Sequence, residues 1–291
     1  MISMLGDDHV PLWQSARRRL LACGETAVDQ LCVGAEATHV PTRMRCRSLL
    51  RSVELQRVLR RLDALRVDLE TGSSTSGLLK GAVLVARMVR TFVPKAEAQA
   101  ATLRVPAERL KRGAAGRSLP VQARMLAECM TGELGLEGCG VDQLDRLQRE
   151  VKQSASAQSA AGRRLTDRLL LDRVVKLKRG APISLSLLYL VVARWAGMSC
   201  SGVAMPDHFL IRLHGPRPQL LDPFNQGRVV TKSDCMRHLR QAGHKRPSDH
   251  LGDVSDRELL RRYVDSVRAA CRGAGAESSA ALDAAFEQLS L

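Results

Sequence analysis

Hydrophobic positions in the first half of the chain recur at helical spacing. Between positions 49 and 69, Arg and Asp residues separate a regular apolar set that indicates an amphipathic helix: Leu50, Val53, Val58, Leu62, Leu65 and Leu69. Leu78–Val93, which is stopped by Pro94, and Val121–Leu134, which follows Ser118 and Pro120, predict two further helices. The first half of the chain is therefore predicted to be helical.

The pattern changes after Asp167. A charged helical segment, DRLLLDRVVKLKR, leads through Gly180 into an almost wholly apolar helix, PISLSLLYLVVARWAG, and then into the short segments GVAM, HFLIRL and QLLD. In HFLIRL, alternation places His208 on one face and Phe209 on the other, as in a strand. The turn residues in HGPRP predict that QLLD pairs antiparallel with HFLIRL. RVV and two more helices follow, the last opened by Ser255 with Glu258 in capping-box spacing.

Two stretches without large side chains suggest breaks between segments. TGSSTSG at positions 71–77 is typical of a linker, and QSASAQSAAG at positions 153–162 of a flexible loop. We therefore expect four regions: a variable helical segment (1–72), a helical layer (73–152), an α/β core (163–240) and a helical tail (241–291).

Composition supports a helix-rich globular protein. Apolar residues make up 45% of the 291 residues but aromatic residues only 3%, so the core must consist of Leu, Val and Ala. The predicted fold class is α+β: a helical N-terminal region, a central apolar helix packed on a small antiparallel sheet, and a helical C-terminal tail.

The formal net charge of +15 is compatible with an anionic partner such as nucleic acid. The basic residues are scattered, however, and usually stand near Asp or Glu, as Arg60 and Arg61 do near Asp63. Solvated helix faces explain such a pattern, so nucleic acid is a weak alternative partner.

Eight cysteines lie far apart without CxxC pairs, which favours reduced thiols and a cytoplasmic location. The opening MISMLGDDHV lacks the apolar stretch of a signal peptide. The longest nearly unbroken apolar run, Ile183–Ala193, is too short to cross a bilayer, so we expect no membrane association.

The order of elements in the second half is that of a papain-type or transglutaminase-type site. Such a site has a Cys at the start of a helix, where the helix dipole and an imidazolium lower the thiol pKa, and an Asp on a neighbouring strand that orients the imidazole. His208 and Asp222 fit the histidine and aspartate roles. The helix, however, opens Gly180-Ala181-Pro182-Ile183-Ser184 and contains no Cys.

The segment KRGAPISLSLLYLVVARWAGMSCSGVAMPDHFLIRL, followed by LLDPFNQG, resembles the SirB-type branch of the transglutaminase-like superfamily. That pattern runs approximately RRGxPISLxxLYLxxARRLGLxxxGVxxPGHFLxR and then xLDPFxGG. The helices from Leu78 onward follow the same order. The resemblance implies a helical N-terminal region, an α/β core and tetratricopeptide-like helices at the C-terminus, of which the tail from Ser255 looks like a shortened version.

The resemblance also implies where the nucleophile has been lost. The position at which active relatives carry Cys falls at or beside Pro182. Ser184 and Ser186 are substitutes, although hydroxyls in a buried or capping helix turn are the simpler interpretation. Cys200 follows the helix rather than opening it.

Two residues depart from the family pattern. Asp207 stands where Gly usually precedes the histidine, and Gln226 stands where the first Gly of the GG pair is common. A purely structural role is the alternative to catalysis: His208 and Asp222 would then form a hydrogen bond that joins two strands.

No cofactor or metal site is predicted. GLEGCG lacks the Lys-Ser/Thr ending of a phosphate loop. Zinc requires four ligands, whereas Cys235, His238 and His244 can be joined only by His250 in a polar loop.

The leading hypothesis is a non-catalytic transglutaminase-like scaffold that binds a protein or peptide in a cleft around His208 and Asp222, with Asp207, Phe209 and Asn225 lining it. The alternative is an amide hydrolase or acyl transferase that uses His208 and Asp222 with a relocated nucleophile. A nonspecific nucleic-acid binder is the weaker third hypothesis. The oligomeric state leaves no trace in the sequence.

Overall fold

The computed structural model describes residues 1–71, 77–90, 96–153, 160–206, 208–271, 282–285 and 287. Its contacts divide the chain into two compact units, Met1–Arg61 and Leu62–Leu291. Most of the linker expected at 71–77 and of the loop expected at 153–162 lies outside the described residues, although 160–162 begin a helix.

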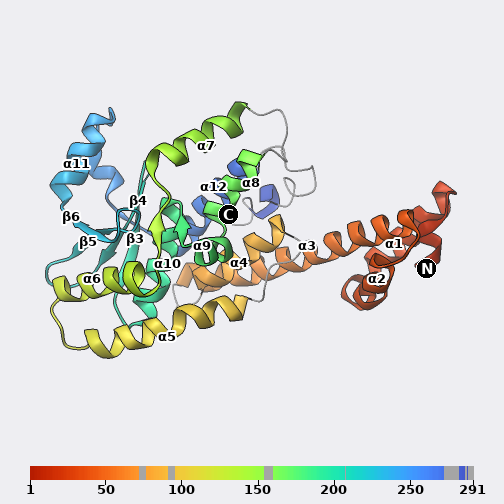
Figure 1. Cartoon of the computed structure of the whole chain (residues 1–291), viewed down its shortest axis with the longest axis horizontal. Coiled ribbons are helices and arrows are strands. Elements are labelled where there is room, and N and C mark those ends of the chain that lie inside the picture. The colour runs from red at the N-terminus through yellow and green to blue at the C-terminus, as the bar shows by residue number, and fades with distance from the viewer. Residues whose placement is uncertain are drawn as a thin grey trace. The chain divides into compact units, whose positions relative to one another are not determined.

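The first unit is a small helical cluster (Figure 1). It contains η1 (Ser3–Gly6), α1 (Val10–Cys23), η2 (Gly24–Ala27), α2 (Val28–Ala35) and the beginning of α3 (Val40–Thr71). Its core is formed by fully buried side chains that include Leu5, Leu20, Leu31, Leu49 and Cys46. The amphipathic helix expected between positions 49 and 69 is therefore part of a longer helix, α3, which continues past Arg61.

Helices make up most of the second unit before the sheet. They are α4 (Gly77–Val89), α5 (Ala96–Ala114), α6 (Leu119–Glu128), the π-helical turn η3 (Cys129–Glu133), α7 (Val141–Gln153), α8 (Ala160–Leu169), α9 (Leu171–Leu177) and α10 (Pro182–Trp195). Two short parallel strands, β1 (Glu137–Gly138) and β2 (Arg179–Gly180), join the segments that precede α7 and α10.

The charged segment expected to form one helix forms two, α8 and α9. Leu170 separates them in an extended conformation, with φ −66° and ψ 123°. The carbonyl of Leu169 accepts hydrogen bonds from the hydroxyls of Ser184 (2.7 Å) and Tyr263 (3.1 Å). These tertiary contacts satisfy the carbonyl at the break, which local helical spacing could not reveal.

The five-stranded sheet is antiparallel throughout. Its order is β6 (Arg228–Val230), β5 (Gln219–Asp222), β4 (His208–Leu213), β3 (Cys200–Met205) and β7 (Asp253–Val254). The predicted hairpin is confirmed, with Ile211 opposite Leu221. The α+β fold class is confirmed as well.

Different helices cover the two faces of the sheet. One face packs against Cys235 and Leu239 of α11 (Lys232–Gln241) and against Leu251, and it carries four buried side chains: Val203, Met205, Leu210 and Leu220. The other face packs on α10, which Figure 1 shows lying along the strands. On that face, a Cβ at Gly202 would lie 3.2 Å from Leu259 of α12 (Asp256–Ala270).

Helix α10 is the centre of the second unit. Every residue from Pro182 to Ala193 is buried, because the sheet covers one side of the helix while α4, α5 and α9 cover others. The apolar sequence of this helix is thus explained by burial on all sides.

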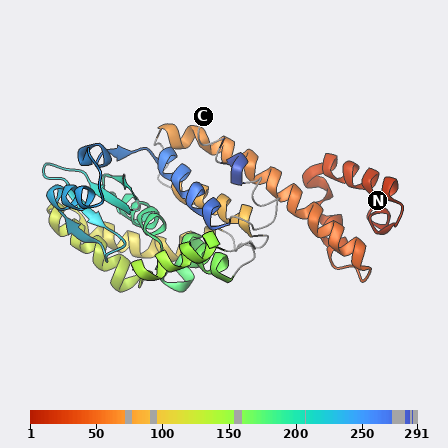
Figure 2. The ribbon, with the colours of Figure 1, turned by 90° about the horizontal axis from the view of Figure 1, so that it is seen from above.

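The C-terminal region differs from the expected helical tail, because the strand β7 lies within it and extends the sheet beside β3. Ser255 caps helix α12, its hydroxyl accepting from the Glu258 amide at 3.1 Å, whereas the Glu258 carboxylate accepts from Arg261 and Arg262 and leaves the predicted capping box half formed. Figure 2 shows α12, in blue, alongside α4, with which it packs. This helix therefore contributes to the core.

None of the helices in the described part of the chain combines the length and apolarity needed to cross a bilayer.

A partly buried ion pair joins the end of α10 to the start of α12. The Arg194 guanidinium contacts both carboxylate oxygens of Asp256 at 2.5 and 2.7 Å, and the two side chains are 19% and 9% exposed. We expect Asp256→Ala to lower the free energy of unfolding by about 3 kcal/mol, because Arg194 keeps a buried charge without its partner. Urea denaturation followed by circular dichroism measures the change.

Asp265→Ala is the matched control, since Asp265 lies on the same helix in an exposed pair with Arg268. It should change the free energy of unfolding by no more than about 0.5 kcal/mol. Equal effects of the two substitutions would show that the Arg194 pair does not hold α12 in place.

Candidate functional site

His208 and Asp222 meet at the end of the sheet. His208 begins β4 and Asp222 ends β5. Ile211 pairs with Leu221, so extending the register by one position places Asp222 opposite Leu210. His208 is therefore the diagonal neighbour of Asp222 on the same face of the sheet. The imidazole Nε2 lies 3.0 Å from Asp222 Oδ2, and the side chains are 18% and 7% exposed.

The contact is close, but it does not meet the geometry of a hydrogen bond. Nε2 is buried and has no hydrogen-bond partner within the described residues, although it lies 3.0 Å from Asp222 Oδ2. The pair therefore has the spacing of a histidine and its orienting carboxylate.

A local turn fixes the Asp222 carboxylate. Oδ1 accepts from the backbone amides of Phe224 (3.1 Å) and Asn225 (3.2 Å), and Oδ2 accepts from the Asn225 side-chain amide (2.7 Å). Burial raises the pKa of Asp222, but the contacts with His208 and Asn225 outweigh it and hold the pKa below its usual value. Asp222 is therefore an ionised anchor for the turn.

The turn closes in a left-handed conformation. The Gly227 amide donates to the Asp222 carbonyl at 2.8 Å, and both Gln226 (φ 59°) and Gly227 (φ 71°) lie in the left-handed region. Gln226 therefore occupies backbone angles that suit the Gly of the family pattern, at a cost of roughly 1 kcal/mol.

Phe224 packs against the histidine and was not singled out from the sequence. Its ring meets that of His208 edge to face, with centroids 6.1 Å apart. Gly138 of β1 lies directly against Phe224, since a Cβ there would be 2.4 Å from the Phe224 carbonyl oxygen. The site therefore depends on a contact between segments distant in sequence.

The start of α10 carries no nucleophile that engages the histidine. Pro182 is the first helical residue, and Ala181 precedes it as the N-cap. The Ser184 hydroxyl donates to the Leu169 carbonyl at 2.7 Å, and the Ser186 hydroxyl donates to the Phe209 carbonyl at 3.2 Å. Both hydroxyls therefore act as donors to buried backbone groups.

Cys200 lies at the wrong end of the strands. It pairs with Leu213, whereas His208 pairs with Met205. Five residues of strand separate these positions, or about 16 Å. Burial raises the Cys200 pKa to about 11, although Arg194 opposes the shift.

Another thiol lies beside the start of α10. The Cys139 amide donates to the Gly180 carbonyl at 3.2 Å. Burial raises the pKa of the Cys139 thiol, while Arg168 and Arg179 oppose the shift. Within the described residues, His208 forms no hydrogen bond with a thiol or hydroxyl.

Comparison with known protein families identifies a related domain. The family described as the transglutaminase-like superfamily matches residues 162–265. The chain contains a transglutaminase-like domain. The matched segment begins in α8, includes α10 and all five strands of the large sheet, and ends within α12.

Three relatives show how far the similarity extends. A UPF0162 protein of Vibrio cholerae is 31% identical over 107 residues, which are 34% of this chain and 38% of the relative. A UPF0162 protein of Xylella fastidiosa is 37% identical over 104 residues, 33% of this chain and 37% of the relative. F-box only protein 21 of Mus musculus is 30% identical over 120 residues, 38% of this chain and 19% of the relative.

Each of these matches spans less than half of the relative's own length. No solved structure shows significant similarity to the chain.

The remaining predicted residues of the transglutaminase-like domain are spread around the pair. Asn225 supports Asp222 directly, whereas alternation turns the Phe209 side chain to the face opposite His208. Asp207 lies outside the described residues. Among the described residues, no three His, Cys, Asp or Glu side chains are grouped as metal ligands, and Cys235 is buried among apolar residues.

Tyr189 is a polar group of the domain that sequence reasoning missed. It is fully buried on α10, and its hydroxyl lacks a hydrogen-bond partner among the described residues. Burial, then Asp222 and Cys129, raise its pKa. The hydroxyl faces Gly227, because a Cβ there would lie 2.9 Å from it. The signal available in the sequence was a Tyr inside an otherwise apolar helix.

Asp222 makes stability pH-dependent. Its folded pKa lies below the unfolded value, so its stabilisation is complete above about pH 3.9 and is lost as pH falls through the folded pKa. Asp222→Asn should lower the free energy of unfolding by about 1.5 kcal/mol at pH 5, from the lost charge-assisted hydrogen bonds. The difference from wild type should shrink toward pH 3, measured by urea denaturation.

Asp145→Asn, which changes an exposed carboxylate on α7, is the control and should give a small difference that does not vary with pH in this way. A difference for Asp222→Asn that stays constant between pH 5 and pH 3 would contradict the ionised anchor.

Gly227 is wedged between α6 and α10. A Cβ there would lie 2.7 Å from the Ala127 Cβ. Gly227→Ala should cost about 1 kcal/mol for the left-handed backbone and about 1–3 kcal/mol more for the clash. Gly116→Ala is the matched control, because its φ is 68° and nothing lies within 4 Å of the new Cβ. Thermal or urea unfolding should show the larger loss for Gly227→Ala, and equal losses would contradict the close packing.

Proposed function

We propose that the transglutaminase-like domain is a non-catalytic module of the SirB type that binds a peptide or protein at the surface around His208 and Asp222. The observation that carries the proposal is that no free nucleophile is found among the described residues at the start of α10. Pro182 is the first residue of the helix, and the hydroxyls of Ser184 and Ser186 donate to backbone carbonyls.

Acyl transfer by such a site requires a nucleophile within hydrogen-bond reach of the histidine. Within the described residues, His208 contacts Asp222 and Phe224, and the Cys200 thiol lies at the opposite end of the strands. A hydroxyl that already donates to a buried carbonyl would lose this hydrogen bond if it turned toward a substrate. The geometry therefore favours binding over catalysis.

The surface near the pair has groups suited to a peptide backbone. His208 is partly exposed, and Asn225 and Arg228 at the turn are exposed. Arg228 pairs with Asp222 in the sheet register, so it shares the face with His208. These side chains can donate and accept hydrogen bonds while the turn beneath them stays fixed by Asp222.

The SirB assignment rests on the residue pattern from Lys178 to Gly227, while the family match and the UPF0162 relatives support the broader transglutaminase-like superfamily. The match to a segment covering 19% of F-box only protein 21 supports a module that functions inside differently built proteins. Regulation or scaffolding is the role that such a module would have without chemistry.

Binding can be tested with a peptide selected from a random 12-residue phage library on the wild-type protein. The synthetic peptide is titrated by fluorescence anisotropy against His208→Ala and Asn225→Ala. We expect the affinity to fall about tenfold or more in at least one variant, because a lost hydrogen bond in a desolvated contact costs about 1.5 kcal/mol. His244→Ala, another partly buried histidine, is the control and should bind normally.

A selected peptide that binds all four proteins equally would contradict binding at this surface. The absence of catalysis is tested separately, by incubating the protein with p-nitrophenyl acetate and measuring its intact mass. No acetyl adduct that depends on His208 should form. An adduct present in wild type and absent in His208→Ala would overturn the proposal.

The alternative is an acyl-transfer enzyme with a relocated thiol, and one observation favours it. The Cys139 backbone is hydrogen-bonded to Gly180, next to the N-cap of α10. If Cys139 were the nucleophile, the acetyl adduct would map to it and would disappear in both Cys139→Ser and His208→Ala. Its burial and raised pKa oppose this role, because a protonated thiol is a poor nucleophile.

A further inference from the structure

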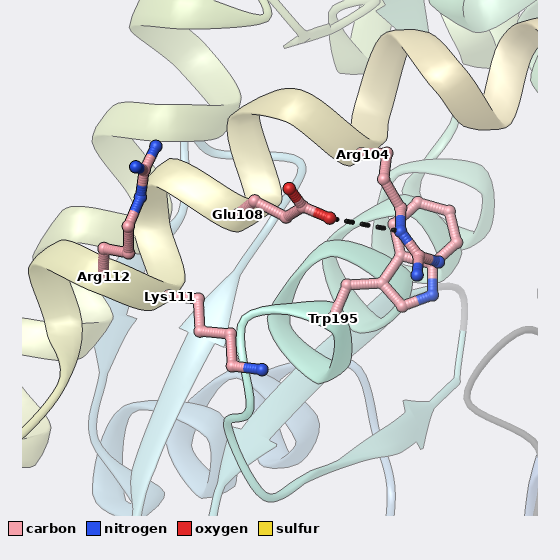
Figure 3. A pocket seen from close by; sticks show the side chains of 5 residues that line it. All are labelled: Arg104, Glu108, Lys111, Arg112 and Trp195. Carbon is pink, nitrogen blue, oxygen red and sulfur yellow. Dashed lines mark ion pairs between the residues drawn. The ribbon is translucent and has the colours of Figure 1, made fainter.

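A basic cavity lies on the side of the second unit where α5 meets the end of α10. Its volume is about 380 Å³, and five residues line it (Figure 3): Arg104, Glu108, Lys111, Arg112 and Trp195. None of them belongs to the His208 site.

The cavity is positively charged. Three cations and one carboxylate line it, and the carboxylate of Glu108 is already paired with Arg104 at 3.6 Å. Lys111 and Arg112 are exposed and have no ion pair within the described residues. Two cations are therefore available for an anionic ligand.

Trp195 gives the cavity an apolar wall. It ends α10 and is partly exposed, and the Arg104 guanidinium lies 5.0 Å from the centre of its ring. Figure 3 shows Arg104 across the indole, Lys111 extending toward it, and Arg112 farther along α5. The ring is thus held in place by a cation–π contact and offers its remaining surface to a ligand.

The geometry points to a short acidic peptide segment as the ligand of this cavity, which we propose as a second binding site independent of the His208 surface. Arg104 and Arg112 lie eight positions apart on α5, which is a rise of about 12 Å. Three or four residues of extended peptide cover that length. Their carboxylates would pair with Lys111 and Arg112 while their aliphatic parts lie against Trp195.

Nucleic acid fits the same cavity less well. Arg104 already stacks on the tryptophan ring that a base would need. Because Glu108 is paired with Arg104, only the cations Lys111 and Arg112 remain for an anion, and two neighbouring charges suit a short acidic segment better than a long phosphate backbone.

The test uses the full chain with Trp13→Phe, which leaves Trp195 as the only tryptophan. A blocked tetraglutamate peptide is titrated while Trp195 emission is recorded, and a fluorescein-labelled copy is titrated against wild type by anisotropy. We expect the peptide to change the emission. Lys111→Gln/Arg112→Gln should weaken binding about fivefold, as expected for two exposed ion pairs, and added salt should weaken binding to wild type.

Arg124→Gln/Arg146→Gln is the matched control, because it removes two exposed charges from α6 and α7 and should not weaken binding. Blocked tetraglutamine should not bind. Equal binding of tetraglutamate to both double variants, or of tetraglutamine to wild type, would overturn the proposal. Tighter binding of an eight-nucleotide oligothymidine, lost in Lys111→Gln/Arg112→Gln, would overturn it in favour of nucleic acid.

Discussion

The burial of α10 on every side is the constraint on which the second unit depends. A helix with twelve consecutive buried residues cannot remain at a surface, so the sheet must cover one side and α4, α5 and α9 others. Burial also dictates the fate of its polar atoms. Ser184 and Ser186 can be buried only because each hydroxyl donates to a backbone carbonyl, and those carbonyls belong to the break between α8 and α9 and to β4. The same bonds that allow the helix to be central hold the hydroxyls of Ser184 and Ser186 on backbone carbonyls.

The His208 site lies at the end of the sheet that packs on α10. The β4–β5 hairpin places His208 diagonal to Asp222, and the turn after Asp222 uses both carboxylate oxygens as acceptors. Phe224 is then pressed between His208 and Gly138, which links the turn to the strand pair that precedes α10. A histidine and a carboxylate held 3.0 Å apart by packing and by the hydrogen bonds of the turn are equally compatible with a structural or a binding role. In the proposed function, Pro182 at the start of α10 is the residue that separates these roles from catalysis.

Much of this arrangement could be predicted from sequence, and the misses have physical causes. The strands and α10 were visible because HFLIRL alternates and PISLSLLYLVV is continuously apolar. Helices α5 and α7 were missed: Pro106 interrupts the first, and the second is mostly polar. Strand β7 has two residues, too few for a periodic signal. The contacts of Gly138 with Phe224 and of α5 with Trp195 join distant segments, so no local pattern records them.

The central claim is that the His208–Asp222 pair activates no thiol. Iodoacetamide labelling between pH 5 and pH 9, with each cysteine followed by peptide mass spectrometry, tests it most directly. The account predicts rapid alkylation only at the exposed Cys23 and Cys32, with rates unchanged in His208→Ala. A buried thiol such as Cys139 that is alkylated quickly at pH 6, and slowly once His208 is replaced, would contradict the account and show an active nucleophile.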